Sequence, residues 1–451
     1  MKRILSILAC LILFVSGAAS EKVKQPEEYL GDAAALLEAI KSGEEDTALS
    51  MMTDELATAL KGQIGKMWAQ LEMQLGAFEK EGEHRAYRQD EFAVVEIALK
   101  FKSISLIFRT SFSESGKAAG IFFTPGVIEK EAAALPSGTI ERTVTATAVE
   151  KYPLEGTLTL PEGDIAAGIV LVQGSGPSDR DETILANHPF LDLAQGLAKK
   201  GIATFRFDKR TFVFGQQMAA SPDYAKLTVD EETADDAAAA ADLLKAQPEM
   251  AGKKVFLLGH SLGGMLASYI GTKTDAVSGY ILMAGSPRKL WELIADQNAL
   301  VAKELPEANA AAATQMVAQD VAKAAALKSL SDDDALKPEN TVFGISAWYL
   351  RHLERIEAAA LHMQDRKPVL VLQGEDDRQV MKDDYLAWQQ KLAEHPDAKF
   401  ILYPQLNHLF GDYEGETPPF MQLMGVEYAQ RTPVAEKVIE DIAAWVAEKA
   451  E

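Results

Sequence analysis

The sequence predicts an α/β fold, in which helices cover a mostly parallel sheet, with a small α+β domain in front of it. Three observations support this prediction. From residue 142 onward, short apolar runs alternate with segments of helical pattern, and such continuous apolar runs form strands that are buried on both faces. Residues 287–366 interrupt this alternation with helical pattern only. Before residue 125 the helical segments come first and the strands follow, which is typical of a separate α+β domain.

The length and composition indicate a soluble enzyme-like chain of more than one domain. The 451 residues exceed a single ordinary core and predict two or three domains. Apolar residues make up 47% of the chain and charged residues 25%, the balance of a globular protein. With 67 acidic and 45 basic residues, the net charge is −22. This charge argues against nucleic acid or an anionic membrane surface as a partner, because both require a basic face.

Residues 1–20 predict a secretory signal peptide. Lys2 and Arg3 form a basic start, residues 4–15 are an apolar stretch too short to span a bilayer comfortably, and small residues lead to a cleavage site near Ser20. The alternative is a retained N-terminal anchor. We expect a mature chain with no membrane span, secreted or held in the bacterial envelope, such as the periplasm.

Cysteine usage bears on redox and metal chemistry. Cys10 is the only cysteine, and it lies in the middle of the apolar stretch rather than at its end, where a lipoprotein would carry it. The mature chain is therefore expected to have no disulfide, no cysteine nucleophile and no thiolate metal site. The sequence also holds no HExxH motif and no paired histidines, so we expect neither a metal nor another cofactor.

The first domain is predicted at residues 25–124. Apolar residues recur at helical spacing from 27 to 75. Strands are then predicted at 91–101, 104–112 and 117–125, with a turn at 113–116. This order resembles the small cone-shaped domain, nuclear-transport-factor-2-like, that precedes some secreted bacterial serine hydrolases. Residues 125–141 carry two prolines and two glycines and are predicted to be a linker.

The second domain is predicted at residues 142–451. A hairpin comes first, at 142–149 and 154–161, and parallel strands follow at 167–174, 202–208, 254–259, 279–285, 368–374 and 399–405. Helices are predicted between them at 190–201, 233–247 and 261–273. Residues 287–366, rich in alanine, leucine and charge, are predicted to be a cap of helices only, inserted into this domain.

The stretch LLGHSLGGMLA, residues 257–267, carries the candidate nucleophile. Ser261 lies between an apolar strand and a helix, on a sharp turn that strains its backbone. Residues two positions away on either side must then be small, and Gly259 and Gly263 meet that need. The turn lifts the hydroxyl to the top of the sheet at the positive end of a helix. The alternative is an ordinary glycine-rich turn between a strand and a helix.

A serine hydroxyl needs a base to take its proton and an acid to hold that base. Among the seven histidines, His408 is favoured because it lies in a loop immediately after the last strand; the alternative is a surface loop histidine. The acid should lie between serine and histidine in the chain. The run VLQGEDDRQV ends a strand, and its spacing favours Asp377, with Asp376 as the second candidate.

The order Ser261, Asp377, His408 across three strand ends resembles the α/β-hydrolase superfamily, over residues 142–451. The run VQGSGPSDRDE, from Val172 on, strengthens the resemblance, because the first strand-to-helix loop of that family bears His-Gly or a variant. In this chain glutamine stands in the place of the usual histidine.

The resemblance implies an oxyanion hole, in which backbone N–H groups stabilise the negative oxygen of the transition state. It assigns these N–H groups to Ser175, which follows Gly174, and to Leu262, which follows Ser261.

The run GSGPSDRDE, residues 174–182, and the run RFDKRTFVFG, residues 206–215, are similar to a subgroup of secreted carboxylesterases and serine aminopeptidase-like hydrolases. In the first, residues 179–181 (DRD) are expected either to form an ion pair near the site or to order the loop. In the second, residues 208–210 (DKR) match a DKRG-type turn, but Thr211 stands where glycine is usual.

These observations predict a secreted serine hydrolase that cleaves small carboxylic esters through an acyl-enzyme on Ser261. One rival is a serine peptidase of the aminopeptidase or prolyl-oligopeptidase type, which could hold a free amine with cap carboxylates such as Glu354 and Glu357. The other is a binding protein on a hydrolase fold. The sequence leaves open the natural substrate, the role of the first domain and the oligomeric state, a homodimer included.

Overall fold

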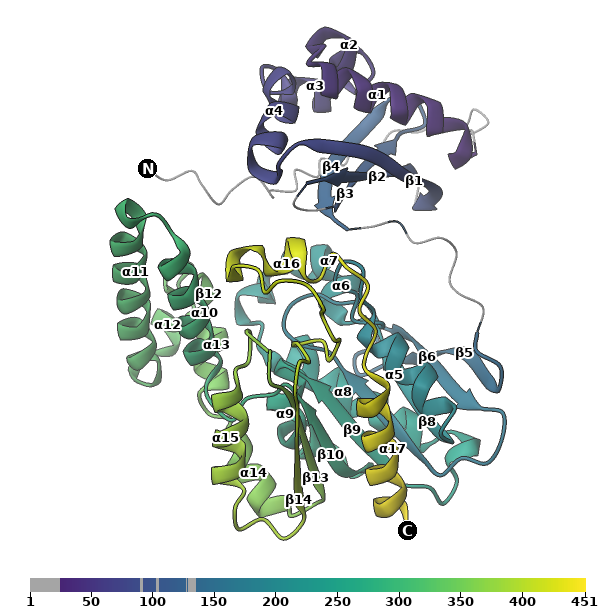
Figure 1. The fold of residues 1–451 in the computed structure, drawn as a ribbon, viewed down its shortest axis with the longest axis vertical. Coiled ribbons are helices and arrows are strands. Elements are labelled where there is room, and N and C mark those ends of the chain that lie inside the picture. The colour runs from purple at the N-terminus through teal and green to yellow at the C-terminus, as the bar shows by residue number, and fades with distance from the viewer. Residues whose placement is uncertain (1–24, 90–91, 103–104, 127, 129–134) are drawn as a thin grey trace. The chain divides into compact units, whose positions relative to one another are not determined.

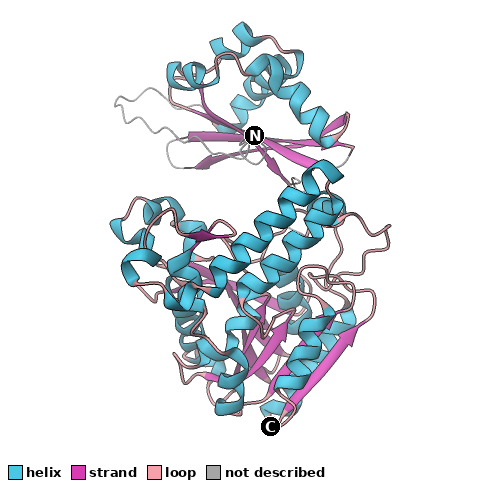
Figure 2. Ribbon diagram, turned by 90° about the vertical axis from the view of Figure 1, so that its left-hand side faces the viewer, coloured by secondary structure: helices cyan, strands magenta, loops and turns pink. Residues whose placement is uncertain are grey.

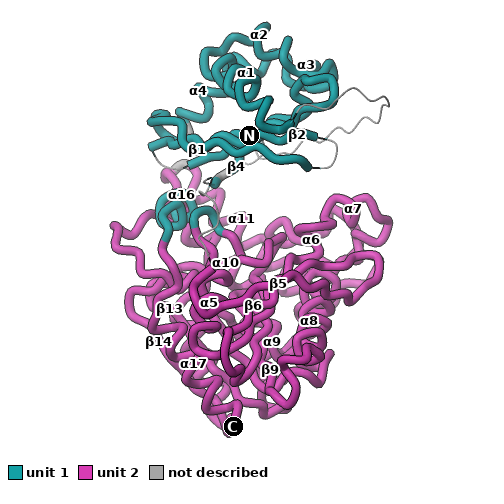
Figure 3. The backbone as a smooth tube through the Cα atoms, turned by 90° about the vertical axis from the view of Figure 1, so that its right-hand side faces the viewer, with its two compact units in different colours: residues 1–133, 184–186, 422–431 teal, residues 134–183, 187–421, 432–451 magenta. Residues whose placement is uncertain are grey.

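The computed structural model describes residues 25–89, 92–102, 105–126, 128 and 135–451. The predicted signal peptide and Cys10 lie outside the described residues. The chain divides into two compact units, shown in different colours in Figure 3. The smaller unit comprises residues 1–133, 184–186 and 422–431, and the larger one comprises 134–183, 187–421 and 432–451.

The smaller unit is a layer of helices on an antiparallel sheet. Its sheet has the strand order β1-β2-β3-β4. The helices cover one face, where Leu36, Ile40, Ile97 and Phe108 are fully buried. The elements are α1 (Leu30–Ser42), α2 (Glu45–Ser50), α3 (Asp54–Leu60), α4 (Ile64–Leu75), β1 (Phe78–Gln89), β2 (Phe92–Phe101), β3 (Ser105–Phe112) and β4 (Ala118–Pro125), and α16 (Leu423–Val426) belongs to the same unit.

Strand β1 is an element that the sequence pattern did not predict. It pairs with β2 at the edge of the sheet, and most of its side chains are exposed. Because both faces of this strand carry charged residues, the apolar alternation that identifies a half-buried strand is missing. Charged side chains on an edge strand also hinder pairing with other chains.

The larger unit is built on an eight-stranded sheet in the order β14-β13-β10-β9-β7-β8-β6-β5. Strands β5 and β6 form the antiparallel hairpin, β6 is also antiparallel to β8, and the pairs from β8 to β14 are parallel. The strands are β5 (Thr139–Ala146), β6 (Leu154–Pro161), β7 (Ala167–Val172), β8 (Ile202–Phe207), β9 (Val255–His260), β10 (Val277–Met283), β13 (Val369–Gly374) and β14 (Ala398–Tyr403). Strand β5 thus begins inside the segment predicted to be the linker.

Helices cover both faces of this sheet, as the continuous apolar runs indicated (Figures 1 and 2). One apolar core joins the sheet to α5 and α17, and a second core joins its other face to α8, α9, α14 (Ala358–Asp365) and α15. On α17, Val438, Ile442 and Trp445 recur at helical spacing and are buried. These helices are α5 (Pro189–Ala198), α8 (Asp235–Lys245), α9 (Leu262–Gly271), α15 (Lys382–Lys391) and α17 (Glu436–Ala450).

The segment between β10 and β13 forms the cap. Its helices are α10 (Leu290–Glu304), α11 (Glu307–Ala325), α12 (Asp332–Ala335), α13 (Ala347–Leu353) and α14 (Ala358–Asp365), with α10 packed against α11 (Figure 1). The prediction of helices only was wrong, because the two-residue strands β11 (Thr341–Val342) and β12 (Ile345–Ser346) form a hairpin. Phe343 and Gly344 between them both have positive φ, which suits a tight hairpin turn. Strands this short leave no alternation to detect.

Within the described residues, none of the helices combines the length and the apolar character needed to cross a membrane.

Candidate active site

Ser261 lies on the turn between β9 and α9. Its backbone has φ 52° and ψ −115°, a left-handed conformation that non-glycine residues rarely adopt. A Cβ on Gly259 would overlap the backbone of Gly263, and a Cβ on Gly263 would overlap the carbonyl of Val172. Both glycines are therefore required by the close approach of backbone segments around the serine, as the sequence pattern indicated.

His408 and Asp377 meet at the ends of β14 and β13. His408 Nδ1 lies 2.7 Å from Asp377 Oδ2, and both side chains are buried. The other oxygen, Asp377 Oδ1, accepts hydrogen bonds from the backbone N–H groups of Gln379 at 2.8 Å and Val380 at 2.9 Å. The neighbouring Asp376 is exposed. Of the two acids that the sequence left open, Asp377 is the one whose carboxylate faces His408.

The contact with Asp377 determines the tautomer of a neutral His408. A carboxylate accepts but does not donate, so the ring proton lies on Nδ1 and the lone pair on Nε2. This is the form in which a histidine can take a proton from a serine hydroxyl. A Cβ on Gly374 would overlap the backbone of Leu406, so glycine at this position lets the acid-bearing loop approach the histidine-bearing loop.

The loop after β7 lies beside Ser261. A Cβ on Gly174 would lie 3.2 Å from Ser261 Cβ and 3.6 Å from Ser261 Oγ. The N–H of Gly174 donates to Glu182 Oε1 at 2.6 Å, so the next N–H along the loop, that of Ser175, is the first one left for an oxyanion. Leu262 begins α9, and the first N–H groups of a helix have no partner inside it. These positions suit the predicted oxyanion hole.

Gln173, the residue that departs from the family pattern, connects two strand ends. Its amide Nε2 donates to the carbonyl oxygen of Phe207 at the end of β8 and to the carbonyl of Asp179 at 3.2 Å. The side chain is fully buried. Gln173 therefore holds the shape of this loop from inside.

A buried network holds the same loop from its other side. Lys209 Nζ donates to the Gly174 carbonyl at 2.9 Å and to Glu232 Oε1 at 2.8 Å, and Gly176 N–H donates to the same oxygen at 3.1 Å. Tyr349 of the cap donates to Glu232 Oε2 at 2.6 Å. Burial raises the pKa of Glu232. The charge and hydrogen bond of Lys209, with the hydrogen bonds from Tyr349 and Gly176, lower it by more, so the net pKa lies below its usual value. Sequence reasoning missed Glu232 and Tyr349, since no local pattern links them to the loop.

The charged run in the loop after β7 pairs with residues at the end of β8. Arg180 binds Asp208 at 2.5 Å, and Asp181 binds Arg206 at 2.6 Å. These ion pairs connect the loop after β7 to the end of β8 and so order the loop. Forming ion pairs and ordering the loop, which the sequence left as alternatives, are therefore not exclusive. Thr211 lies in the short helix α6 (Arg210–Val213) and does not have a positive φ, so this turn does not require the glycine usual in the family.

The cap carboxylates suggested for an amine site are already paired. Glu354 Oε1 accepts from Trp291 Nε1 at 2.7 Å, and Glu354 Oε2 lies 3.6 Å from Lys328 Nζ. Glu357 pairs with Lys289 at 2.8 Å.

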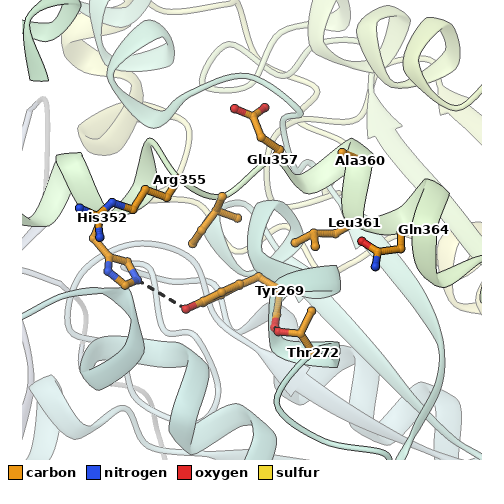
Figure 4. A pocket seen from close by; sticks show the side chains of 9 residues that line it. Tyr269, Thr272, His352, Arg355, Glu357, Ala360, Leu361 and Gln364 are labelled. Carbon is orange, nitrogen blue, oxygen red and sulfur yellow. Dashed lines mark hydrogen bonds between the residues drawn. The ribbon is translucent and has the colours of Figure 1, made fainter. Parts of the chain in front are cut away.

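A cavity of about 350 Å³ lies elsewhere in the larger unit (Figure 4). It is lined by Tyr269 from α9 and by His352, Arg355 and Gln364 from the α13–α14 region. Tyr269 Oη lies 3.5 Å from His352 Nε2, the contact drawn as a dashed line. Its lining contains none of the predicted catalytic residues, so this cavity is separate from the site around Ser261.

Among the described residues, no group of three or more histidine, cysteine, aspartate or glutamate side chains is arranged to hold a metal ion.

The sheet order, the strained serine turn and the Asp–His pair define an α/β-hydrolase. Residues 188–412 match the family described as serine aminopeptidase, S33, and residues 33–121 match a protein family of unknown function, DUF3887. The chain is 30% identical over 403 residues to esterase EstD of Thermotoga maritima, covering 89% of this chain and 91% of that protein. This protein therefore belongs to the α/β-hydrolase family that includes EstD. The predicted fold class is confirmed.

Solved structures of two esterases are similar in fold. Est1E from Butyrivibrio proteoclasticus is 15% identical, with a TM-score of 0.42 and coverage of 68% of this chain and 98% of Est1E. An esterase from Pyrococcus furiosus is 12% identical, with a TM-score of 0.44 and coverage of 72% of this chain and 97% of that one.

Proposed function

We propose that this protein is a serine carboxylesterase that cleaves small esters through an acyl-enzyme on Ser261. The observation that carries the proposal is that one sheet holds both a strained serine turn and a buried acid–histidine pair: Ser261 has φ 52°, and His408 Nδ1 lies 2.7 Å from Asp377 Oδ2. Both features are costly in isolation. They occur at the ends of β9, β13 and β14, which belong to the parallel part of one sheet, with β10 between β9 and β13.

The first half of the reaction acylates the serine. Ser261 Oγ attacks the ester carbonyl carbon while His408 Nε2 takes the hydroxyl proton, and Asp377 stabilises the resulting imidazolium. The N–H groups of Ser175 and Leu262 stabilise the oxyanion, and one such donor lowers the barrier by about 3 kcal/mol. The tetrahedral intermediate collapses, the C–O bond to the alcohol breaks, and His408 gives its proton to the leaving alkoxide.

The second half releases the acid. His408 takes a proton from a water molecule, whose oxygen attacks the acyl carbon of the ester formed with Ser261. The oxyanion returns to the same two N–H groups. The bond to Ser261 Oγ then breaks, the serine regains its proton from His408, and the carboxylic acid leaves.

The peptidase alternative uses the same triad on an amide. The description of the matching family, serine aminopeptidase, favours testing it. Against it, Glu354 and Glu357 are engaged by other cap residues, so binding a free amine would require breaking those contacts. The resemblance to EstD, an esterase by name, supports the ester.

The deciding experiment compares wild type with Ser261→Ala on nitrophenyl esters from C2 to C12 and on aminoacyl nitroanilides. We expect ester turnover that is lost in the variant, with a chain-length optimum that measures the acyl pocket. Turnover of nitroanilides alone would replace the esterase with the peptidase. No turnover on either series would favour the binding protein.

The export of the protein is a separate proposal, supported by residues 1–20. N-terminal sequencing of the protein recovered from the periplasm or the medium of a bacterial host tests it. A start near Glu21 is expected, and an intact Met1 would contradict cleavage.

A further inference from the structure

His260, the residue before the nucleophile, is buried between two oxygen atoms. The side chain lies at the end of β9 and is 3% exposed. Its Nδ1 lies 3.0 Å from Glu182 Oε1, and its Nε2 lies 2.9 Å from the backbone carbonyl oxygen of His408. The rings of His260 and His408 are 4.6 Å apart between centroids. His260 therefore contacts the segment that holds the proposed catalytic base.

The two neighbours of His260 determine its charge. A backbone carbonyl can only accept a hydrogen bond. When the Glu182 carboxylate is ionised, it too can only accept, so each ring nitrogen must then donate a proton. A neutral imidazole has one N–H, whereas the imidazolium has two. Burial lowers the pKa of His260. The Glu182 carboxylate, the His408 carbonyl and the Asp377 charge together raise it by more, so the net pKa lies above its usual value.

Glu182 lies in the loop after β7, residues 173–188, which we call the oxyanion loop, and it connects the backbone of this loop to His260. Its Oε1 accepts both from His260 and from the N–H of Gly174. The side chain is 3% exposed, and its backbone has φ 52°, a strained conformation for a residue with a side chain. Within the described residues, its second oxygen has no hydrogen-bond partner. The chain therefore retains a strained residue with a half-satisfied buried carboxylate, which are two costs to folding stability.

We propose that Glu182 and His260 form a buried ion pair that positions the oxyanion loop and the His408 loop around Ser261. The pair links three segments: the loop after β7 through Gly174, the end of β9 through His260, and the loop after β14 through the His408 carbonyl. It rests on the proposed function, because it assigns these residues a role in that reaction. They are positioning residues, since they act through Gly174 and His408 and not on the substrate.

The ion pair determines which backbone N–H groups are left to bind the oxyanion. By taking the Gly174 N–H, Glu182 excludes that group from the substrate and leaves the following N–H, that of Ser175. An N–H in the wrong place would misalign the oxyanion, and a displacement of about 1 Å can cost about 100-fold in rate.

The kinetic test uses Glu182→Gln, His260→Gln, their double variant and Glu162→Gln as the control. Glu162 directly follows β6 in the same unit, and its side chain is exposed. We expect kcat to fall by at least about tenfold in both single variants with KM within about threefold, because geometry and not substrate affinity is lost. The double variant should be no slower than the slower single variant, as for residues that act as one unit. The control should stay within about twofold of wild type.

A second readout does not depend on the substrate. The rate at which a fluorophosphonate labels Ser261 reports the alignment of the nucleophile, its base and the oxyanion donors. We expect slower labelling in Glu182→Gln and His260→Gln and unchanged labelling in the control. A wild type that labels rapidly but turns over no ester would overturn the proposed function and leave the positioning role to be decided by labelling.

A third readout examines the charge directly in the wild type, so it does not require any variant to fold. In ¹⁵N-histidine NMR, His260 should carry protons on both ring nitrogens at pH 7. A single protonated nitrogen would overturn the ion pair. Unchanged kcat and labelling in Glu182→Gln, or an equal loss in Glu162→Gln, would overturn the positioning role.

Discussion

Two buried histidines of the larger unit have opposite surroundings. His260 has an oxygen acceptor at each ring nitrogen, whereas neither ring nitrogen of His362, in α14, has a hydrogen-bond partner in the part of the chain that the structure describes. His362 packs instead edge-on against the rings of Tyr280 and Trp388. The pKa of His260 is raised, whereas burial lowers that of His362 to about 3, with a smaller contribution from the charge of His395.

The comparison shows that burial alone does not decide whether a group is charged. Burial disfavours the charged form of both histidines, and only the acceptors around His260 reverse the result. Glu232 follows the same rule, since burial raises its pKa, but donors on both of its oxygens bring the net pKa below its usual value. His362, by contrast, is buried as a neutral ring against two aromatic side chains. The following predictions test this contrast.

The largest effect is expected from the acid that faces His408. Asp377→Asn should lower kcat for an ester by about 10⁴-fold, because an amide at this position favours the wrong histidine tautomer. Asp376→Asn is the matched control and should leave kcat within about twofold of wild type, since Asp376 is exposed. Steady-state kinetics of both variants measures the difference. Equal losses would contradict the assignment of the acid.

Breaking a compensated buried charge should cost folding stability. Lys209→Met leaves Glu232 buried without its cation, and removing one partner of a buried pair costs about 3–5 kcal/mol. Urea unfolding followed by circular dichroism measures this loss. Lys337→Met is the control, because Lys337 forms an exposed pair with Asp334 and its loss should leave the unfolding midpoint unchanged.

The same pair predicts a pH dependence. Because the folded pKa of Glu232 lies below its ordinary value of 4.5, the carboxylate stabilises the folded state above that value, and this contribution is lost as the pH falls through the folded pKa. Lys209→Met should therefore flatten the acid side of a plot of unfolding free energy against pH. An unchanged slope would contradict the role of Lys209.

Replacing His362, whose ring nitrogens have no hydrogen-bond partner among the described residues, should increase stability at acid pH. The unfolded chain protonates His362 below about pH 6.5, whereas the folded chain does so only near pH 3, so wild type loses stability as the pH falls between these values. His362→Phe removes this loss and should gain about 2 kcal/mol at pH 5 relative to its difference from wild type at pH 8. A difference that does not change with pH would show that His362 is charged when folded.

The smallest effect is expected at the exposed surface of the cap. Glu357 pairs with Lys289 and is 61% exposed, and such pairs contribute little. Glu357→Gln should leave ester kcat/KM within about twofold of wild type. A large loss on aminoacyl nitroanilides in this variant would instead support the peptidase alternative.

Much of the fold could be predicted from the sequence because its signals are local. Continuous apolar runs indicated the buried strands, and the glycines around Ser261 indicated a turn that only small residues permit. The chain order of serine, acid and histidine pointed to an acid and a histidine that lie 2.7 Å apart in the structure. Strand β1 and the β11–β12 hairpin had no apolar alternation, so local pattern did not reveal them.

The choice among chemically equivalent residues was decided only by the tertiary structure. Asp376 and Asp377 are adjacent and identical in type, and only the orientation of the loop places one carboxylate against His408. Glu182 and His260 are separated by 78 positions, and no periodicity connects them. The physical reason is that the charge and function of a buried polar group depend on the atoms brought against it by folding, whereas the sequence pattern determines which segments become buried.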